Sequence, residues 1–497
     1  MLLALTYDMN VSCAAPSEPA AASPAFTSKD KTVLKARRLM DEGRFADAEK
    51  TLRDKVGKSP AGDVEARTQL LEIIRRTRLE YSMTLDALLR KVQADIPNTT
   101  AKDLDQWISE AKIRERRIDG QRFFFSGEPK NIYLFSSTAK ARLHKAGKGK
   151  KASKWKLTDH MQAVVDEAEK TGQVEVIPVK HRFTHKLTID PNLPQIKPGS
   201  VVRVWLPYPQ EYRQQSDVKL LSASPTPKLI APSAQEGNPV TGAPQRTIYF
   251  EKVVTNTAEA LVFQEEVEFI SHAYYPKLDP AAVKPLPADW KGAYLGERPP
   301  HIVFAPEIKK QVAAIVGKET NPLEKARKIF RWVSASIPWN SEDEYCIIPS
   351  FALKGFNARR GDCGVQNTVF VTMCRIVGVP ARWQSGYETK PVKDDWGMHD
   401  WAEIYIAPWG WLPADASYGV KPSNDPRIAD FYCGHQDSYR FIVNLDWGRE
   451  LVPPKQSMRS EPADFQRGEV EVDGKNLYFD SWHTKTDVIR EPVTPSL

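Results

Sequence analysis

The spacing of apolar residues changes its period twice along this chain of 497 residues, and these changes constrain the fold more than any other feature. Residues 29–95 place apolar side chains at helical spacing, residues 180–269 contain runs that alternate apolar and polar side chains, and helical spacing returns after residue 300. Helices and strands are therefore segregated along the chain, which is typical of α+β proteins. With ~100–200 residues per domain, an α+β multidomain protein of about three domains is predicted.

The first 28 residues are predicted to be disordered or to be a truncated export segment. Met1–Leu5 is apolar, but it is too short for the hydrophobic part of a signal peptide and lacks a basic n-region. Val11-Ser12-Cys13-Ala14-Ala15 opens a Pro-, Ser- and Ala-rich stretch that is typical of chain just after an export signal. We therefore expect an exported or periplasmic protein, with a disordered tail on a cytoplasmic protein as the alternative.

The composition excludes several classes of protein. The net charge of +7 is mild for this length, and much of the excess lies between Lys145 and Lys156. No apolar run approaches the ~20 residues of a membrane span. The five cysteines, at irregular spacing, match neither a disulfide framework nor a zinc site. No cofactor, metal or membrane span is expected.

Two small units are predicted before the strands. Residues 29–96 resemble one helix–turn–helix of the tetratricopeptide kind, with the turn at Gly43. A protein partner could bind through this helical region. Residues 97–140 combine a helix capped by Thr100 and Asp103 with a hairpin turn at Asp119-Gly120 and strands at 122–125 and 131–135. The second unit resembles a winged helix, but no cluster of Arg and Lys marks its helix, so nucleic acid is an unlikely partner.

Residues 141–177 are predicted to be a basic linker followed by a helix, and residues 178–285 an antiparallel β-sandwich. The sandwich is inferred from alternating strands separated by Pro-rich turns, at 180–189, 200–206, 246–250 and 260–269. His181 and His185 lie on one strand face, which we interpret as half-exposed rather than as a metal pair, because no third ligand is near in sequence.

One thiol, one imidazole and one carboxylate follow in the order Cys363, His399, Asp415. Cys363 lies in Arg359-Arg360-Gly361-Asp362-Cys363-Gly364, directly before an apolar helix for which Asp362 is a suitable N-cap. A thiol in the first turn of a helix is expected to have a lowered pKa. These residue types are the minimum set for a thiol acyl-transfer enzyme.

His399 begins an alternating run, and Asp415 follows a second strand after a Pro-Trp-Gly turn. Adjacent antiparallel strands would bring the imidazole and the carboxylate side by side. Asp395, Asp400 and Glu403 are rival carboxylates. Asp400 should point to the opposite face from His399 because strand side chains alternate, so Asp415 is preferred.

Together these blocks resemble the transglutaminase-like superfamily. The blocks stand in order over about 90 residues: Arg359–Gly364, Arg375–Arg382, Gly386-Tyr387, His399–Glu403 and Gly410–Asp415. Further similarity surrounds Ile337–Asn340 and Glu344–Pro349. The resemblance implies a papain-like core within residues 286–497, preceded by the β-sandwich and followed by C-terminal strands at 430–445 and 468–482.

The resemblance also implies roles. Cys363 maps to the nucleophile, His399 to the base and Asp415 to the orienting carboxylate. Trp339 is either a donor to an oxyanion hole or a packing residue. A thioester on Cys363 is then expected from a protein or peptide amide, and either water or an amine resolves it. The alternative is a non-catalytic binding or assembly protein that retains the fold.

Overall fold

The structure is a computed structural model that describes residues 23–54, 60–148, 155–237, 240–392 and 396–493. The predictions for residues 1–22, including Cys13, and for Asp395 lie outside the described residues, as does most of the predicted basic linker. In the described ranges no helix is both long enough and apolar enough to cross a membrane.

The N-terminal region is helical from residue 29, as predicted, but the disorder predicted for the first 28 residues is wrong for Pro24–Thr27, which form a short helix with Ala25 buried. Its helices are α1 (Pro24–Thr27), α2 (Lys31–Asp41), α3 (Phe45–Arg53), α4 (Ala61–Glu80), α5 (Leu85–Asp95) and α6 (Ala101–Ala111). Gly43, between α2 and α3, has φ +78°, and a Cβ there would lie 2.7 Å from the carbonyl oxygen of Arg117. The turn therefore needs glycine both for its conformation and for the close approach of the neighbouring hairpin.

The helix and hairpin of the next unit follow the prediction, but its last predicted strand is wrong. Thr100 and Asp103 form the capping box of α6, and β1 (Glu115–Ile118) pairs with β2 (Gln121–Phe124) around a turn in which Asp119 and Gly120 have positive φ. Residues 131–135 belong to α7 (Lys130–Phe135), which is followed by α8 (Ser137–Lys145). The Glu128 carboxylate accepts from the backbone N–H groups of Asn131 and Ile132, and this local cap favours a helix over a strand.

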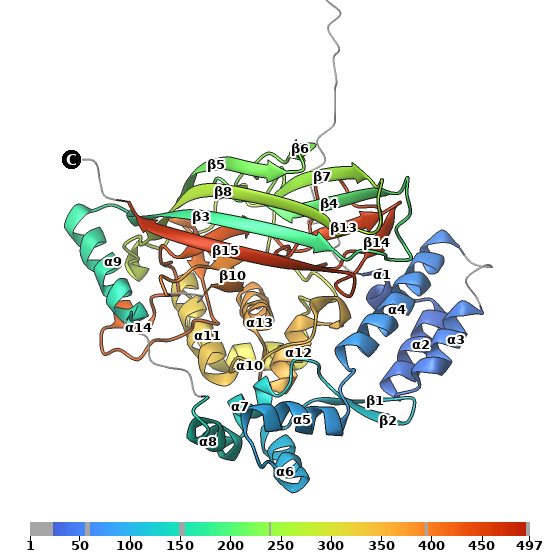
Figure 1. Cartoon of the computed structure of the whole chain (residues 1–497). Helices are drawn as coiled ribbons and strands as arrows, with labels where there is room; N and C mark the ends of the chain where they lie inside the picture. The colour runs from blue at the N-terminus through green and yellow to red at the C-terminus, as the bar shows by residue number, and fades with distance from the viewer. Residues whose placement is uncertain (1–22, 55–59, 149–154, 238–239, 393–395, 494–497) are drawn as a thin grey trace, which may run out of the picture.

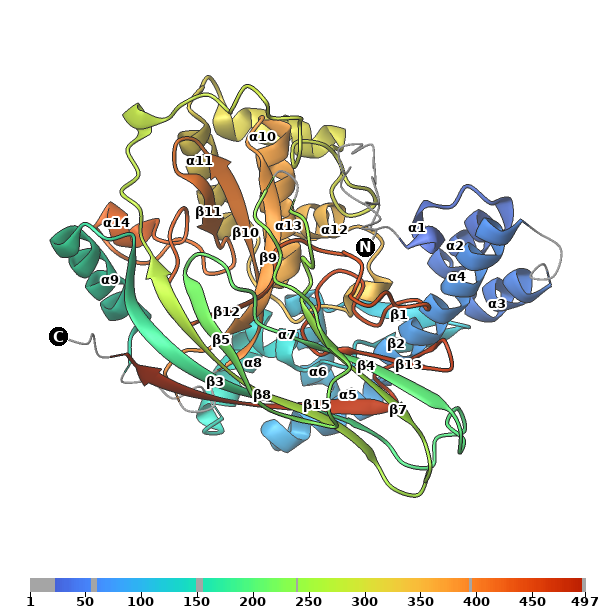
Figure 2. The same cartoon turned by 90° about the horizontal axis from the view of Figure 1, so that it is seen from above.

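Two antiparallel sheets lie over the rest of the molecule (Figures 1 and 2). One has the order β15 (Trp482–Pro492), β3 (Glu175–Ile189), β8 (Leu261–Tyr274), β5 (Gln215–Ser224). The other has the order β14 (Lys475–Leu477), β13 (Glu469–Val472), β4 (Val201–Pro207), β7 (Thr247–Val253), β6 (Leu229–Ile230). The predicted strands are confirmed, and α9 (Leu157–Thr171) precedes them.

The strands after residue 468, β13, β14 and β15, complete these two sheets and do not join the sheet of the predicted core. β13 pairs with β4, and β15 pairs with β3 over its whole length. The strand pairing therefore crosses the boundary predicted at residue 285. His181 and His185 on β3 are fully buried, so the half-exposed face expected for them is wrong.

A third, mixed region contains the predicted chemistry. Its sheet has the order β11 (Gly410–Ala414), β10 (Gly397–Ile406), β9 (Ala381–Glu388), β12 (Arg440–Asn444). Its helices are α10 (Pro306–Val316), α11 (Pro322–Ser336), α12 (Phe351–Ala358), α13 (Cys363–Ile376) and α14 (Pro426–Ala429). Helix α13 is buried along nearly its whole length and contacts β9 and β10. Of the strand predicted at 430–445, only β12 forms.

We expect Gly386→Ala to lower the free energy of unfolding by about 3 kcal/mol, because a Cβ on β9 would lie 1.9 Å from the carbonyl oxygen of Phe441 on β12. Urea denaturation followed by tryptophan fluorescence measures this. Gly397→Ala is the matched control, since a Cβ at Gly397 on β10 meets nothing within 4 Å. Equal stability of the two variants would contradict the close strand approach.

Candidate active site

Cys363 is the first residue of α13, as the sequence predicts. The Asp362 side chain accepts from the Val365 backbone N–H at 3.1 Å and caps the helix. The flanking glycines have no room for a side chain. A Cβ at Gly361 would lie 2.4 Å from Val365 Cγ1, and one at Gly364 would lie 2.0 Å from the Tyr345 hydroxyl. The hexapeptide thus sets both the helix start and the close packing around the thiol.

The thiol faces two carboxyl groups. Cys363 Sγ donates to Asp400 Oδ2 at 3.4 Å, and the Tyr345 hydroxyl lies 2.9 Å from Asp362 Oδ2 and from Asp400 Oδ2. Burial raises the pKa of Asp400 to about 6 and, with Glu342 and Asp400 nearby, raises that of Asp362 well above its usual range. Burial and these carboxyls likewise raise the pKa of Cys363. The expected lowering of the thiol pKa is therefore wrong, because burial and like charge outweigh the helix end.

His399 and Asp415 lie side by side on β10 and directly after β11, which are antiparallel neighbours as predicted. His399 Nε2 is 2.7 Å from Asp415 Oδ2. Asp415 also accepts from the backbone N–H groups of Ser417 and Tyr418. Burial acts to raise the pKa of Asp415, but His399 and Arg440 outweigh it and hold that pKa below its usual range. The carboxylate is thus charged and fixed against the imidazole.

The side chains of His399 and Asp400 turn to opposite faces of β10, as alternation predicts. His399 packs beside Trp401 and Tyr418, whereas Asp400 points to the thiol. Cys363 and His399 line one cleft of about 1110 Å³, and the hydrogen bond of the thiol goes to Asp400 rather than to the imidazole. The third rival, Glu403, pairs with Arg382 in the core beyond the cleft.

Trp339 lies on the wall of this cleft with 36% of its surface exposed. The packing interpretation of this residue is therefore wrong. The Lys130 Nζ of α7 lies 4.6 Å from the centre of the Trp339 ring. The backbone of Trp339 forms an isolated β-bridge with Gly361, just before the helix that begins at Cys363.

The part of the chain that carries Cys363, His399 and Asp415 is similar to a known protein family. Residues 309–416 match the family model of the transglutaminase-like superfamily, and this range holds α11, α13 and β9–β11 together with Trp339, Cys363, His399 and Asp415. They are a transglutaminase-like core domain.

The relatives found are distant. An uncharacterized protein of Haemophilus influenzae is 30% identical over an alignment that covers 24% of this chain and 39% of that protein, so the chain spans less than half of the relative. A candidate cysteine protease from Cytophaga hutchinsonii is 14% identical, with a TM-score of 0.42 and coverage of 65% of this chain and 93% of that one. The periplasmic domain of TgpA from Pseudomonas aeruginosa is 13% identical, with a TM-score of 0.25 and coverage of 51% and 91%.

Residues that sequence reasoning missed hold the transglutaminase-like core domain in register. Asn367 Nδ2 donates to the carbonyls of Cys363 and Asp400, both at 2.9 Å, while Asn367 Oδ1 accepts from the Ala416 N–H at 3.0 Å. One buried amide therefore ties α13 to β10 and to the residue after Asp415. Its signal in the sequence is an amide side chain one turn after Cys363, on the same face of the helix.

Arg440 of β12 is a second missed residue. It is 1% exposed, lies 2.9 Å from Asp415 Oδ2 and 3.2 Å from Asp437 Oδ2, and packs over the rings of Trp401, Tyr418 and Tyr432. Arg440 thus contacts the same oxygen of the Asp415 carboxylate as His399 Nε2 does.

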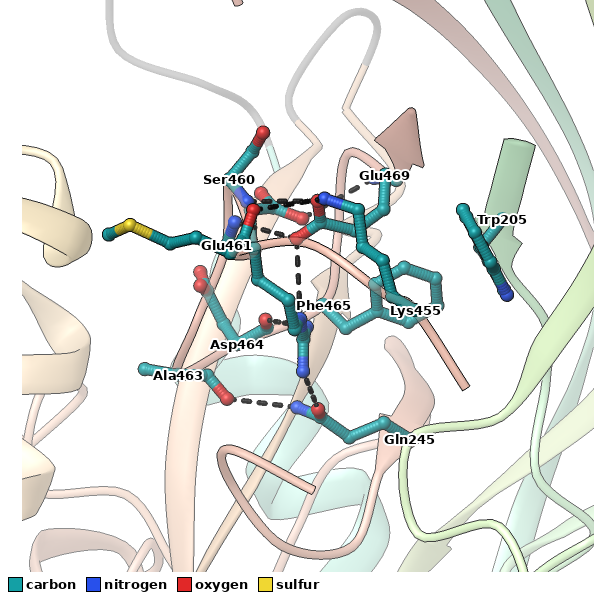
Figure 3. Close-up of polar contacts among 12 residues, drawn as sticks. Trp205, Gln245, Lys455, Ser460, Glu461, Ala463, Asp464, Phe465 and Glu469 are labelled. Atoms are coloured by element: carbon teal, nitrogen blue, oxygen red, sulfur yellow. Dashed lines mark hydrogen bonds and ion pairs between the residues drawn. The ribbon is translucent and has the colours of Figure 1, made fainter. Parts of the chain in front are cut away.

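The segment 446–468, between β12 and β13, supplies the floor of the cleft. Glu469 fixes its turn: the carboxylate accepts from the backbone N–H groups of Ser460 and Glu461 and pairs with Lys455 (Figure 3). Burial acts to raise the pKa of Glu469, but Lys455 and Arg459 outweigh it and hold that pKa at about 2. From this turn Gln466 reaches Asp400 Oδ1 and the His399 carbonyl, both at 3.1 Å.

No group of three or more His, Cys, Asp or Glu side chains suited to a metal ion occurs in the part of the chain that the structure describes. His181 instead contacts the Thr389 hydroxyl at 2.8 Å. The ionisable groups nearest the thiol are the carboxyl of Asp400, the hydroxyl of Tyr345 and the carboxyl of Asp362.

Proposed function

We propose that this protein is a cysteine acyl-transfer enzyme that acts on amide bonds of proteins or peptides. The observation that carries the proposal is that Cys363, at the start of a buried helix, shares one cleft with the imidazole of His399, which is fixed at 2.7 Å by Asp415. The superfamily match over residues 309–416 supports the same chemistry.

In the proposed first half-reaction, His399 takes the proton of the thiol and Cys363 Sγ attacks the amide carbonyl. Since Nε2 is held by Asp415, Nδ1 is the ring atom left for the thiol. The oxyanion of the tetrahedral intermediate would accept from the backbone N–H of Cys363 and the indole N–H of Trp339. The imidazolium then protonates the leaving amine, the C–N bond breaks, and a thioester to Cys363 remains.

In the proposed second half-reaction, water or an amine attacks the thioester, with His399 as the base. Asp415 keeps the ring oriented and stabilises the imidazolium in both halves. The thiol must first exchange its hydrogen bond to Asp400 for one to His399. In this proposal the contact of the thiol with Asp400 is the resting state, in which the thiol is protonated.

The alternative is a binding or assembly protein that keeps the fold without catalysis. The observation that favours it is that the hydrogen bond of the thiol goes to Asp400 and not to His399. The two functions differ in one product, a thioester on Cys363.

Hydroxylamine trapping with glutamine-containing peptides distinguishes them. We expect the wild type to convert a dansylated peptide to its hydroxamate, and mass spectrometry of a quenched reaction to find the acyl group on Cys363. Cys363→Ala and His399→Gln should form no hydroxamate, and Cys374→Ala, which removes a thiol buried in the same helix, should retain activity. Hydroxamate formation by Cys363→Ala would rule out Cys363 as the nucleophile, and no hydroxamate from the wild type with a broad peptide set would favour the binding function.

A further inference from the structure

The N-terminal region builds one wall of the cleft. Lys130 and Leu134 of α7, Lys140 and His144 of α8, and Lys148 just after α8 all line it. Figure 1 shows α5–α8 on the side of the core away from the β3–β8–β15 sheet. A segment about 200 residues before the thiol in sequence thus contributes to the surface that a substrate would contact.

This wall is firmly attached to the loop that carries Trp339. Asn131 Nδ2 donates to the Ser341 carbonyl at 3.0 Å, and the Ser341 N–H donates to Asn131 Oδ1 at 2.7 Å. Arg360, three residues before Cys363, donates to the Ala111 carbonyl at 2.9 Å and packs over the ring of Phe135. The wall and the nucleophile are therefore held in a fixed relation.

The wall carries exposed positive charge. Lys140, His144 and Lys148 follow one another at intervals of four residues, so the first two lie on one face of α8. All three are exposed, and among the ion pairs between described residues none involves them. These side chains are available to a ligand.

The carboxylates of the cleft do not cancel this charge, because they already have partners or are buried. Arg467 pairs with Glu344 at 2.6 Å and with Glu461 at 2.7 Å. Lys354 pairs with Glu342 and Asp343, each at 2.6 Å. Glu388 pairs with Lys390 at 3.2 Å. Burial and neighbouring carboxyls raise the pKa of Asp362 and of Asp464 well above the usual range, which favours their neutral forms. Among the described residues of this wall, the unpaired charge exposed to solvent is therefore that of Lys140 and Lys148.

Apolar side chains interrupt the basic wall. Leu134 is 45% exposed, Trp339 36% and Met398 47%, and all three line the cleft near its charged side chains. Exposed large apolar residues gathered in one cleft indicate a binding surface. Their mixture with lysines suits a chain that carries both apolar and acidic side chains.

We propose that the α7–α8 wall selects the substrate, and that the substrate is a polypeptide segment in which apolar and acidic residues flank the reacting amide. The presence of a reacting amide rests on the proposed function, but binding of such a polypeptide to the α7–α8 wall can be tested without any reaction. Acidic side chains would lie along Lys140 and Lys148, and an apolar one beside Leu134, Met398 and Trp339.

Binding of fluorescein-labelled peptides of 12 residues to the full-length Cys363→Ala protein tests this by anisotropy. The peptides share a central Gln and alternate Leu with Glu, Gln or Lys. We expect the Glu peptide to bind about tenfold more tightly than the Gln peptide at low salt, and this preference to fall as salt screens the charges. Adding K140E/K148E should abolish the preference for Glu and favour the Lys peptide.

The control is K35E/K102E, which makes the same change of net charge at exposed lysines outside the cleft and should leave the preference intact. Equal binding of the three peptides, no binding at all, or a preference for Glu that survives K140E/K148E would overturn the proposal. Displacement of the Glu peptide by an oligothymidylate of equal charge would overturn its polypeptide part. The hydroxamate assay with the wild type tests the acyl-transfer chemistry on its own, and the anisotropy assay tests peptide selection on its own. Failure of one proposal can therefore be told from failure of the other.

Discussion

Arg440→Met should lower the free energy of unfolding by about 4 kcal/mol at pH 7, because it leaves two buried carboxylates without their cation. Asp415 and Asp437 are 3% and 2% exposed, and Arg440 contacts both. Methionine fills much of the same volume between the rings of Trp401 and Tyr418, so the loss comes mainly from the charge. Urea denaturation followed by circular dichroism measures it.

The effect should depend on pH in a defined direction. For both Asp415 and Asp437 burial acts to raise the pKa, but nearby cations outweigh it and lower the pKa in the folded protein. A carboxyl whose folded pKa is lowered contributes stability above its unfolded pKa of ~3.9 and loses it as the pH falls toward the folded value. Between pH 5 and pH 3, around the unfolded pKa, the free energy of unfolding of the wild type should therefore fall more than that of Arg440→Met. The difference in stability between the two proteins should shrink over this range.

Arg427→Met is the matched control. Arg427 also contacts two carboxylates, Glu169 and Asp425, but its side chain is 43% exposed. Exposed pairs of this kind contribute at most about 1 kcal/mol. If Arg440→Met were no less stable than Arg427→Met at pH 7, Arg440 would not be the support of the His399–Asp415 pair.

Local chemistry explains what the sequence could predict. The start of α13 depends on Asp362 and two glycines within the same hexapeptide, and the β1–β2 turn has Asp119 and Gly120, both with positive φ, at its centre. Strand alternation was enough to separate the side chains of His399 and Asp400. Where a local signal was overlooked, as with the Glu128 cap of α7, the prediction of a strand failed.

Contacts between distant segments explain the rest. Arg440 and Gln466 reach Asp415 and Asp400 from strands and turns that only the folded chain brings near, and neither stands in a recognisable motif. The pairing of β13 with β4 joins residues more than 250 positions apart. The raised pKa of the Cys363 thiol has in part the same origin, because burial in the folded core and Asp400, which lies on a separate segment, both raise it. A helix terminus visible in the sequence could not reveal that environment.

Asp400→Asn should increase the rate of alkylation of Cys363 by iodoacetamide about tenfold or more at pH 7.5. The amide is nearly isosteric and keeps an oxygen within reach of Tyr345, but it removes a negative charge 3.4 Å from the sulfur. A like charge this close shifts a pKa by ~1–3 units, and each unit changes the thiolate fraction about tenfold while the thiol is mostly protonated. Alkylation, resolved by peptide mass spectrometry, measures that fraction.

The increase should fade below about pH 6, where Asp400 of the wild type itself takes up a proton, since burial raises its pKa to about 6. Asp362, Tyr345 and Gln466 surround the same carboxyl and are unchanged in the variant. The buried Cys346, Cys374 and Cys433 serve as internal controls in every digest, and exposed Asp105→Asn matches the change of charge. An alkylation rate that did not rise, or that rose equally at pH 5, would mean that Asp400 does not hold the thiol in its protonated form. A rise confined to neutral and higher pH would identify the charged Asp400 as the group that keeps Cys363 protonated, and the thiol would have to leave it before His399 could take the proton.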